Sequence, residues 1–513
     1  AGAGTLTQGT NATLNIGDAS IGPTLVASAS GNTVNWNRAG TQTVKPTTYT
    51  NLTLSGSGAK TTTGVAVNGS LSMQGTATVS AAPTYGASAV LVYAGSSSQT
   101  TGPELTATIP NLTVSNANGV SLDSSPTING TLTLTSGTIM TGSNAVVIGP
   151  SGTVSRTSGH VIGNLQKNVA TGATSRTFEV GTACNYNPVT IALSNVTGSG
   201  NLTAKATAGE HPNIASSAIN SSKNVNAYWT LTNSGITFDN YSATFTFVSG
   251  DVDVGAGTSD FIVGKYSGGW TYPAVGTKTA TTTQATGLTS FSDFAVGERS
   301  VASKLAITAT PGSATAGSNF SVTVQSQDAN GNPANVSANT DISLAISTHS
   351  GSGSVGILSG NTATITAGTN SVTLTSVQYT KAENITLTAA RTSGDPLTTS
   401  AASSSITVAA GSFTKLQLLV PGETADAGTA TGKSGSPSAQ TAGSSFTVTV
   451  NAVDANWNRV SSTHTVAITS SDGAATPPPS AALGAGTGTR DFTVTLKTAG
   501  TQTVTASDIT NPS

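Results

Sequence analysis

The sequence predicts an all-β protein made of a short parallel β-helix, a β-sandwich and two tandem immunoglobulin-like sandwiches. The clearest observation is a phrase written twice, one domain length apart: T-A-G-S-N-F-S-V-T-V-Q-S-Q-D-A-N-G-N at Thr315–Asn332 and T-A-G-S-S-F-T-V-T-V-N-A-V-D-A-N-W-N at Thr441–Asn458. In both copies apolar residues alternate with polar ones, as in a half-buried strand, and Asp-Ala-Asn-x-Asn follows as a polar turn. The chain is rich in Thr, Val, Gly and Asn and has no sustained helical periodicity, so helices are not expected.

A weaker duplication in the first part of the chain predicts the β-helix. Short strands entered through an Asn recur at steps of about 20 residues, which is typical of stacked coils. They are Tyr49–Leu54, Val67–Met73, Ile109–Val114 and Ile128–Leu134. The Asn residues are expected to occupy left-handed corners and to bond from coil to coil. An antiparallel sandwich with Asn-Gly hairpins at Asn68 and Asn129 is the alternative.

Changes in residue composition and strand pattern along the chain predict four domains. The β-helix is expected over residues 1–155, and an aromatic-rich sandwich over residues 156–300. Two immunoglobulin-like modules are expected over residues 301–411 and 412–513, each introduced by an apolar strand. The strand Thr501–Ala506 is interpreted as the last strand of the second module.

The composition excludes several classes of partner. Only 8% of residues are charged and the net charge is −2, so no nucleic-acid partner is expected. No apolar run approaches the roughly 18 residues of a membrane span, so no membrane insertion is expected. The lone Cys184 excludes an internal disulfide framework. Because no basic segment followed by an apolar one opens the chain at Ala1, any signal peptide is expected to be already removed.

The sequence predicts no catalytic centre and no cofactor. Ala427–Ser434 satisfies a relaxed phosphate-loop pattern, but Gly-Ser-Pro-Ser follows it where a helix should begin. The four histidines share no metal-ligand spacing. The acids Asp18, Glu104 and Asp123 are too isolated along the β-helix for the paired carboxylates of a glycosidase.

Calcium binding is expected to be weak at best. The turns that begin at Asp328 and Asp454 place oxygen side chains at alternate positions, but each carries a single carboxylate. Asp251 and Asp253, with Asp260 nearby, make a better candidate, although solvated carboxylates at a strand end are the simpler interpretation.

Two kinds of interaction site are predicted. Trp36, Tyr93 and Trp270 are candidate stacking faces for a glycan, and Trp457 lies in a turn where its ring should be partly exposed; packing in the core is the alternative for each. The uncharged strands Thr10–Ile16 and Thr501–Ala506 are candidate joining segments, because an unpaired strand edge can pair with another chain.

Parts of the chain resemble known surface proteins. Thr48–Lys60 (T-Y-T-N-L-T-L-S-G-S-G-A-K), Gly163–Gly181, Tyr228–Leu231 and Phe291–Gly297 resemble secreted surface proteins of the Bacteroidetes and Chlorobi groups. The C-terminal half resembles bacterial immunoglobulin-like repeats of the invasin and adhesin kind, in the segments Val420–Glu423, Gly428–Lys433 and Val453–Asn458. The resemblance implies an exported protein of the cell surface.

These observations together predict a non-enzymatic extracellular structural protein. It would be a subunit of a surface fibre, sheath or adhesive appendage that self-associates through β-strand edges. One alternative is a monomeric adhesin that binds glycan or matrix through exposed aromatic residues. Another is the accessory region of a longer secreted hydrolase.

Overall fold

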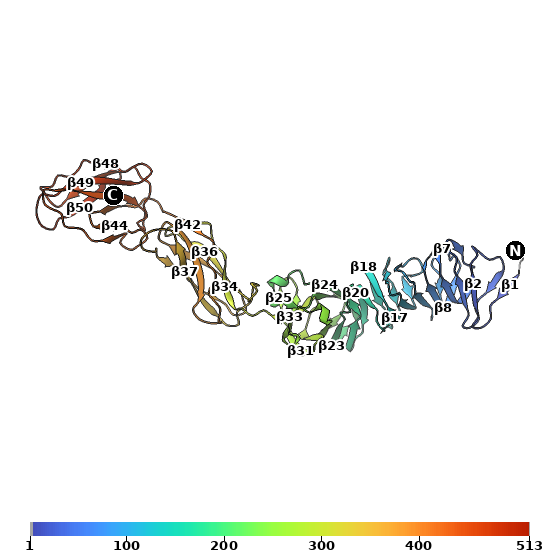
Figure 1. The fold of residues 1–513 in the computed structure, drawn as a ribbon. Helices are drawn as coiled ribbons and strands as arrows, with labels where there is room; N and C mark the ends of the chain where they lie inside the picture. Colours follow the sequence, from blue (N-terminus) through green and yellow to red (C-terminus); the bar gives the residue numbers. More distant parts are fainter. Residues whose placement is uncertain (1–3, 512–513) are drawn as a thin grey trace. The chain divides into compact units, whose positions relative to one another are not determined.

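The computed structural model describes residues 4–511 and confirms the all-β fold, with 53% of the chain in strands and 2% in helices. The chain divides into two compact units, one ending at Arg299 and the other beginning at Ser300 (Figure 1). The helical residues include three short 3-10 turns, Ile214–Ser216, Ser249–Asp251 and Thr258–Asp260. Within residues 4–511, no helix is long and apolar enough to cross a membrane.

Unit 1 begins with a β-solenoid of about 9 turns (Figure 1). Its longest face is a ladder of neighbouring strands: β2 (Thr13–Ile16), β4 (Thr33–Trp36), β6 (Thr48–Leu54), β8 (Ala66–Met73), β11 (Val90–Tyr93), β14 (Asn111–Ser115), β17 (Thr131–Ser136) and β19 (Thr153–Arg156). These strands pair in parallel, so that Leu52 lies between Val34 and Leu71 of the adjacent coils. The parallel register confirms the predicted β-helix and rules out the hairpin alternative.

Shorter strands complete the coils of the solenoid. They are β1 (Thr5–Thr7), β3 (Thr24–Val26), β5 (Gln42–Thr43), β7 (Ser57–Thr61), β9 (Thr76–Val79), β10 (Thr84–Tyr85), β12 (Gln99–Thr100), β13 (Thr108–Ile109), β15 (Val120–Ser121) and β16 (Thr127–Ile128). Alternation along the strands sends aliphatic side chains inward, where Val34, Leu52 and Leu71 are all 0% exposed. Stacked aliphatic residues therefore form the solenoid core.

Asparagines bond the coils to one another, as predicted, but they do not supply the left-handed corners. The Asn51 amide donates to the Asn32 carbonyl at 2.9 Å and accepts from the Ser70 N–H at 3.1 Å. Between residues 4 and 511, Asn11 is the only asparagine with a positive φ, and glycines take most such positions. At Gly75 an added Cβ would lie 2.3 Å from the Gly56 carbonyl oxygen, so no larger residue fits there.

The solenoid continues into a sandwich without a break in its core. One sheet contains β12, β15, β18 (Thr138–Ile148), β20 (His160–Val169), β24 (Gly200–Ala208), β26 (Ala227–Ser234), β33 (Asp293–Arg299), β29 (Phe261–Tyr266) and β30 (Trp270–Thr271), with β22 (Val180–Gly181) and β25 (Ile219–Asn224) beside it. Pairing changes from parallel at β18–β20 to antiparallel at β20–β24. The facing sheet contains β21 (Gly172–Phe178), β23 (Val189–Gly198), β28 (Tyr241–Thr246), β32 (Thr282–Leu288) and β31 (Ala274–Lys278), with β27 (Thr237–Phe238) beside β23. A single apolar cluster runs from Ile16 to Val296, across the predicted limit near residue 155.

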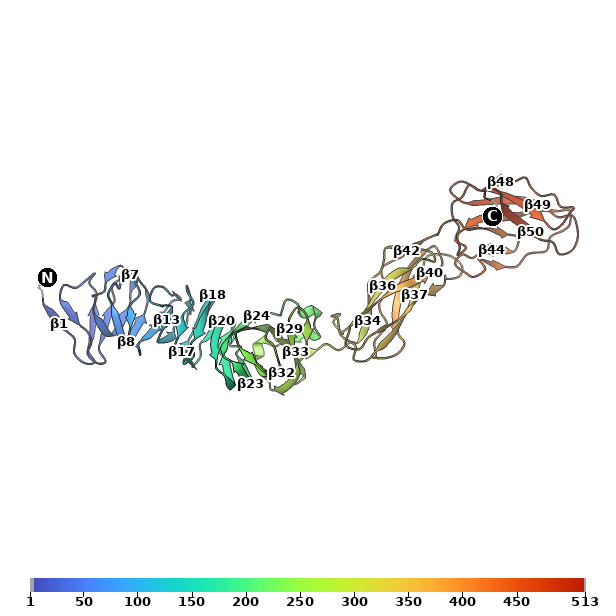
Figure 2. The same cartoon turned by 180° about the vertical axis from the view of Figure 1, so that it is seen from behind.

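Unit 2 contains two sandwiches, here called module 1 and module 2 (Figure 2). One sheet of module 1 has β34 (Lys304–Ala309), β36 (Phe320–Gln327), β40 (Ser371–Tyr379) and β38 (Leu358–Ser359); the other has β35 (Ser313–Thr315), β42 (Ile406–Ala409), β41 (Asn384–Arg391), β37 (Thr340–His349) and β39 (Thr362–Ile365). The sheets of module 2 are β43 (Lys415–Leu419), β46 (Ser445–Val453), β49 (Thr489–Thr495) and β48 (Ala481–Ala482), β47 (Thr465–Ser470), β50 (Val504–Asp508), with a hairpin of β44 (Glu423–Ala425) and β45 (Lys433–Gly435).

The duplicated Asp-Ala-Asn-x-Asn turn joins the two modules. Asp454 accepts hydrogen bonds from the backbone N–H groups of Asn456 and Asn458, at 2.8 and 2.9 Å, which closes the turn. The Asn458 amide then donates to the Thr380 carbonyl at 2.8 Å and accepts from the Ala382 N–H at 2.7 Å. In module 2 the turn is therefore also one of the contacts to the preceding module.

Asn458→Ala is expected to lower the free energy of unfolding of unit 2 by about 1–3 kcal/mol, because it leaves the polar groups of the Thr380–Ala382 loop without partners. Asn332→Ala is the matched control, since Asn332 occupies the same place in the module 1 turn and its amide bonds Asp328 at 3.2 Å. Denaturant titration of both variants measures the difference. Equal losses would contradict the role of the turn at the junction.

Candidate functional site

Two of the predicted stacking aromatics are core residues. Trp36 is 0% exposed and Tyr93 is 1% exposed, so neither offers a face to a ligand. Trp36 shares the inward face of β4 with Val34, and Tyr93 shares the inward face of β11 with Leu91. For these two residues the glycan-stacking interpretation is wrong, and the core alternative holds.

The other two tryptophans are half-buried, and their rings are partly engaged. Trp270 packs against Gly264, where an added Cβ would lie 2.9 Å from the ring, and it meets the His211 ring edge-on at 5.0 Å. The Lys415 ammonium lies 3.4 Å from the centre of the Trp457 ring, and the indole N–H donates to the Ala430 carbonyl at 3.3 Å. Partner binding at Trp270 and Trp457 stays a prediction.

The acids of the solenoid are not as isolated as the sequence indicates. Glu104 is 3% exposed and accepts hydrogen bonds from the Tyr93 hydroxyl at 2.7 Å and the Gly102 N–H at 2.9 Å. Burial raises the pKa of this carboxyl, and the bond from Tyr93 opposes the rise. Asp123 accepts from the Thr101 hydroxyl at 2.6 Å. Glu104 and Tyr93 therefore form a buried, hydrogen-bonded pair in the solenoid.

The predicted calcium positions are occupied by hydrogen-bond donors of the protein. Asp251 is buried, not solvated, and its two oxygens accept from the amides of Asn185 and Asn187 at 2.7 and 2.6 Å. Asp253 accepts from the Asn224 N–H at 2.9 Å and the Asn226 amide at 2.7 Å. Among residues 4–511, no three His, Cys, Asp or Glu side chains are grouped as metal ligands would be.

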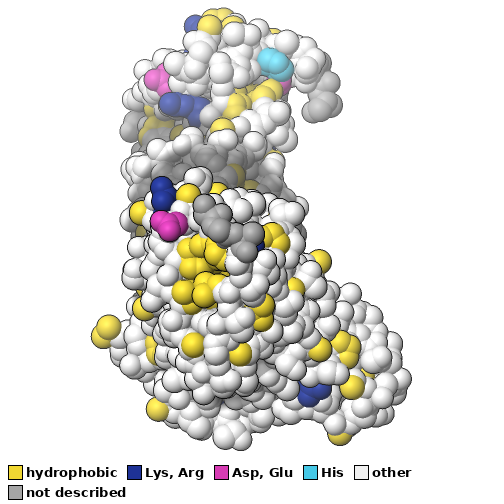
Figure 3. Space-filling model, turned by 90° about the vertical axis from the view of Figure 1, so that its right-hand side faces the viewer, with side chains coloured by type: hydrophobic (Ala, Val, Ile, Leu, Met, Phe, Trp, Pro, Cys, Tyr) yellow, Lys and Arg dark blue, Asp and Glu magenta, His cyan; other side chains and the backbone are white. Residues whose placement is uncertain are grey.

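The first candidate joining segment lies in the first coil of the solenoid that the structure describes. Of the predicted segment Thr10–Ile16, the last four residues form β2, and the first two form a turn. In the part of the chain that the structure describes, β2 pairs with β4 alone and β1 with β3 alone. Leu6 and Val26 are 39% and 38% exposed beside them. Figure 3 shows apolar side chains gathered on this end face.

The second candidate joining segment is an edge strand of module 2. The strand begins at Val504, later than predicted, and over the described residues β50 pairs with β47 alone. In module 2, Ala506 of β50 lies opposite Ile468 of β47. In module 1, Ala389 of β41 lies opposite Leu344 of β37 in the equivalent register. β50 is therefore the counterpart of β41, and β42 has no counterpart among residues 4–511. β50 is the last strand that the described residues of module 2 form, as predicted.

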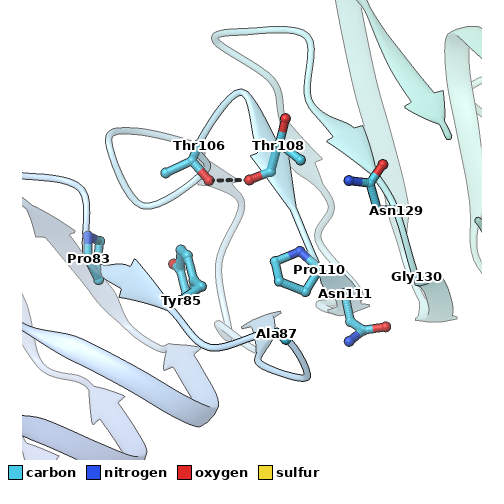
Figure 4. Close-up of a pocket in the computed structure, with 9 residues that line it drawn as sticks. All are labelled: Pro83, Tyr85, Ala87, Thr106, Thr108, Pro110, Asn111, Asn129 and Gly130. Atoms are coloured by element: carbon cyan, nitrogen blue, oxygen red, sulfur yellow. Dashed lines mark hydrogen bonds between the residues drawn. The ribbon is translucent and has the colours of Figure 1, made fainter.

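A shallow groove crosses three coils of the solenoid (Figure 4). Its volume is about 490 Å³, and its lining includes Tyr85, Pro110, Asn111 and Asn129 and no charged side chain. Asn111 and Asn129 lie on successive coils, and the Thr106 hydroxyl donates to the Thr108 carbonyl at 2.7 Å. A neutral groove with amides and one tyrosine suits a neutral, hydroxyl-rich ligand.

Comparison with known proteins assigns no family. No protein-family model matches the chain, and no curated protein matches it. Among solved structures, the chain is similar to the Escherichia coli adhesin FdeC, at 13% identity over 68% of this chain and 93% of that chain, with a TM-score of 0.19. The FN1–FN3 domains of chicken CNTN1 match at 9% identity over 52% and 88%, with a TM-score of 0.16. Domains 4–9 of the surface layer protein SbsC match at 18% identity over 53% and 41%, with a TM-score of 0.15. Similarity at this level assigns no function.

Proposed function

We propose that this chain is a non-enzymatic extracellular structural protein that assembles into a surface fibre, sheath or adhesive appendage through β-strand edges. The observation that carries the proposal is that, among residues 4–511, β1 and β2 each pair along one edge only, beside exposed Leu6 and Val26. Solenoid ends that stay in water are usually covered by a polar cap, and unpaired edges invite strand addition. The exposed apolar side chains at this end are better suited to contact with another protein surface than to water.

The two candidate edges are of different kinds, which favours an open polymer over a closed dimer. β1 ends a parallel solenoid, whereas β50 is the edge of an antiparallel sheet in module 2. When unlike surfaces join head to tail, copies add without limit unless the rotation closes a ring. Ladders of backbone hydrogen bonds within each unit would carry tension along such a polymer without side-chain chemistry.

Lysine substitutions on β1 test the proposal. Thr5→Lys combined with Thr7→Lys is expected to abolish assembly and leave the melting temperature unchanged, because both residues are exposed and edge charges repel a second strand. Ala192→Lys is the control, since Ala192 is exposed on β23, an interior strand. Deletion of Ala1–Gly17 is expected to have the same effect as the β1 charges. Sedimentation velocity measures assembly. If the β1 variants assemble as well as the parent chain, the proposal is contradicted.

A monomeric adhesin that binds a neutral glycan is the second candidate, and the groove of Figure 4 is the observation that favours it. Tyr85→Ala is expected to weaken glycan binding by about 2- to 10-fold if the ring stacks on a sugar, in line with the roughly 0.5–1.5 kcal/mol that aromatic contacts contribute. Measuring the glycan-array binding of Tyr85→Ala and of Trp270→Ala shows which of the two aromatic residues contacts the glycan. Unchanged binding in both variants would exclude these two aromatics.

A further inference from the structure

A cleft lies in the middle of the solenoid, where one of its strand ladders is interrupted. The Ala94 N–H donates to the Met73 carbonyl at 3.0 Å, so the two coils are still paired at the ends of β8 and β11. Beyond this point, over residues 4–511, β9 pairs with β7 alone and β12 with β15 alone. The cleft between β9 and β12 has a volume of about 430 Å³, and its lining includes residues 75–79 and 98–104. Two unpaired strand edges therefore border the cleft.

One carboxyl group lines the cleft, and only one of its two oxygens has a donor in the protein. Glu104 is 3% exposed, and its Oε1 accepts hydrogen bonds from the Tyr93 hydroxyl at 2.7 Å and the Gly102 N–H at 2.9 Å. In the described part of the chain no donor reaches the other oxygen, Oε2, yet this atom is not sealed from solvent. A Cβ added at Gly102 would lie 3.1 Å from Oε2, so this oxygen lies beside Gly102 in the wall of the cleft.

The other two buried glutamates of the described chain each have a basic partner. Glu179 pairs with Lys167 at 2.6 Å, and Glu383 lies 3.8 Å from the ammonium of Lys381. Glu104 forms no such pair within residues 4–511, and none of the described side chains that line the cleft is a lysine, arginine or histidine. A buried carboxylate without a counter-charge is unfavourable. A cationic group that enters the cleft would supply both the charge and the donor that Glu104 lacks.

The shape and chemistry of the cleft favour an ammonium group over a guanidinium group. A guanidinium is held best by two carboxylate oxygens at once, and here Oε1 already accepts two hydrogen bonds. An ammonium needs only one oxygen. The side chains of Met73, Ala77 and Val79 also line the cleft, and such apolar walls suit the alkyl chain that carries an ammonium.

We propose that the cleft between β9 and β12 binds a primary ammonium group on an alkyl chain, with Oε2 of Glu104 as its acceptor. A lysine side chain and a free diamine both carry this group. The unpaired edges of β9 and β12 would give a lysine in an extended peptide additional backbone hydrogen bonds. Because the cleft lies within the solenoid and uses neither β1 nor β50, the proposal goes beyond the assembly function and is independent of it.

Calorimetric titration of the full chain with cadaverine and with the blocked tripeptide Thr-Lys-Thr tests the proposal. Glu104→Gln is expected to weaken binding of these probes at least about 10-fold, because a charge-assisted hydrogen bond is lost. Gly102→Ala is expected to weaken binding as well, because it crowds Oε2 without changing the charge. Asp18→Asn is the matched control, since it removes one negative charge from an exposed acid of the same solenoid, and it should leave the affinity unchanged.

The affinity should also depend on pH. Burial, with a smaller contribution from the charge of Asp123, raises the pKa of Glu104, so the carboxylate is lost at a higher pH than in water. Ammonium binding should therefore weaken as the pH falls through this raised pKa. The other titratable groups that face Glu104 are Tyr85, Tyr93 and Asp123. Burial raises the pKa of both tyrosines, so neither ionises in this range.

The outcomes separate ammonium recognition from a structural role of Glu104. Glu104→Gln should melt at a temperature no lower than the parent chain, because it removes a buried charge that has no partner. Binding of both probes supports recognition of the ammonium alone, and binding of the tripeptide alone supports a peptide ligand. The proposal is overturned if neither probe binds the parent chain, or if Glu104→Gln binds as tightly as the parent. Equal binding of a tripeptide with norleucine in place of lysine would overturn it too.

Discussion

Trp229→Ala is expected to lower the free energy of unfolding of unit 1 by about 3–5 kcal/mol, the cost of removing a large aromatic side chain from a packed core. Trp229 is 0% exposed on β26, where its ring lies 5.1 Å from that of Phe245. Its indole N–H also donates to the Asn187 carbonyl at 2.8 Å, and the substitution leaves that buried oxygen without its partner. Denaturant titration followed by circular dichroism measures the loss.

Trp270→Ala is the matched control for the Trp229 variant. Trp270 belongs to the same sandwich but is half-buried, and its indole N–H donates to the Asn213 carbonyl at 3.0 Å. Because Trp270 buries less area than Trp229, its replacement is expected to lower the free energy of unfolding by a clearly smaller amount. Comparable losses in the two variants would contradict the assignment of Trp229 to the centre of the unit 1 core.

Glu179→Gln is expected to cost about 3–5 kcal/mol, because it leaves the ammonium of Lys167 buried without a counter-charge. The two side chains are 9% and 12% exposed and lie 2.6 Å apart where the solenoid meets the sandwich. Burial lowers the pKa of Lys167, and Glu179 opposes that shift. The variant should therefore show a still lower Lys167 pKa.

The pH dependence gives this second prediction a signature that simple loss of packing lacks. Between the lowered folded pKa and the unfolded value of 10.5, the unfolded chain binds the proton and the folded chain does not, so stability rises with pH. The deficit of Glu179→Gln relative to the parent should shrink as the pH approaches 10.5. The double variant Lys167→Met with Glu179→Leu should recover most of the loss. A deficit independent of pH would contradict the buried-cation account.

The sequence predicts the solenoid because its signal is local and repeated. Each coil enters a strand through polar residues and sends alternate aliphatic residues inward, and Leu52, Leu71 and Leu132 are accordingly all 0% exposed. The point at which the solenoid continues into the sandwich cannot be predicted from this pattern. Strands in both regions have the same period of two, so alternation does not show where parallel pairing at β18 changes to antiparallel pairing at β24.

Alternation along the strand also indicates that Trp36 and Tyr93 belong to the core. Trp36 stands two residues after Val34, and Tyr93 two residues after Leu91, which places each ring on the apolar face of its strand. Trp457 has no such neighbour pattern and adopts a φ of 69°, as a turn residue. Alternation thus separates core aromatics from half-buried ones better than the identity of the residue does.

The correspondence between β50 and a strand of module 1 depends on a comparison that the duplicated phrase alone does not provide. The phrase covers β36 and β46 and leaves the later strands unaligned. The register at β41 and β50 shows that Thr501–Ala506 matches the strand before β42. Sequence alternation marks both as strands, but which strand lies beside which is a property of the folded sheet.

Electron microscopy of the undenatured full chain, combined with its mass in solution, tests the central claim most directly. Assembly through strand edges predicts regular fibres whose axial repeat is no longer than one chain, together with masses that grow with concentration. Separate monomers at every concentration would contradict the account, and the neutral groove beside Tyr85 would then become the leading functional site.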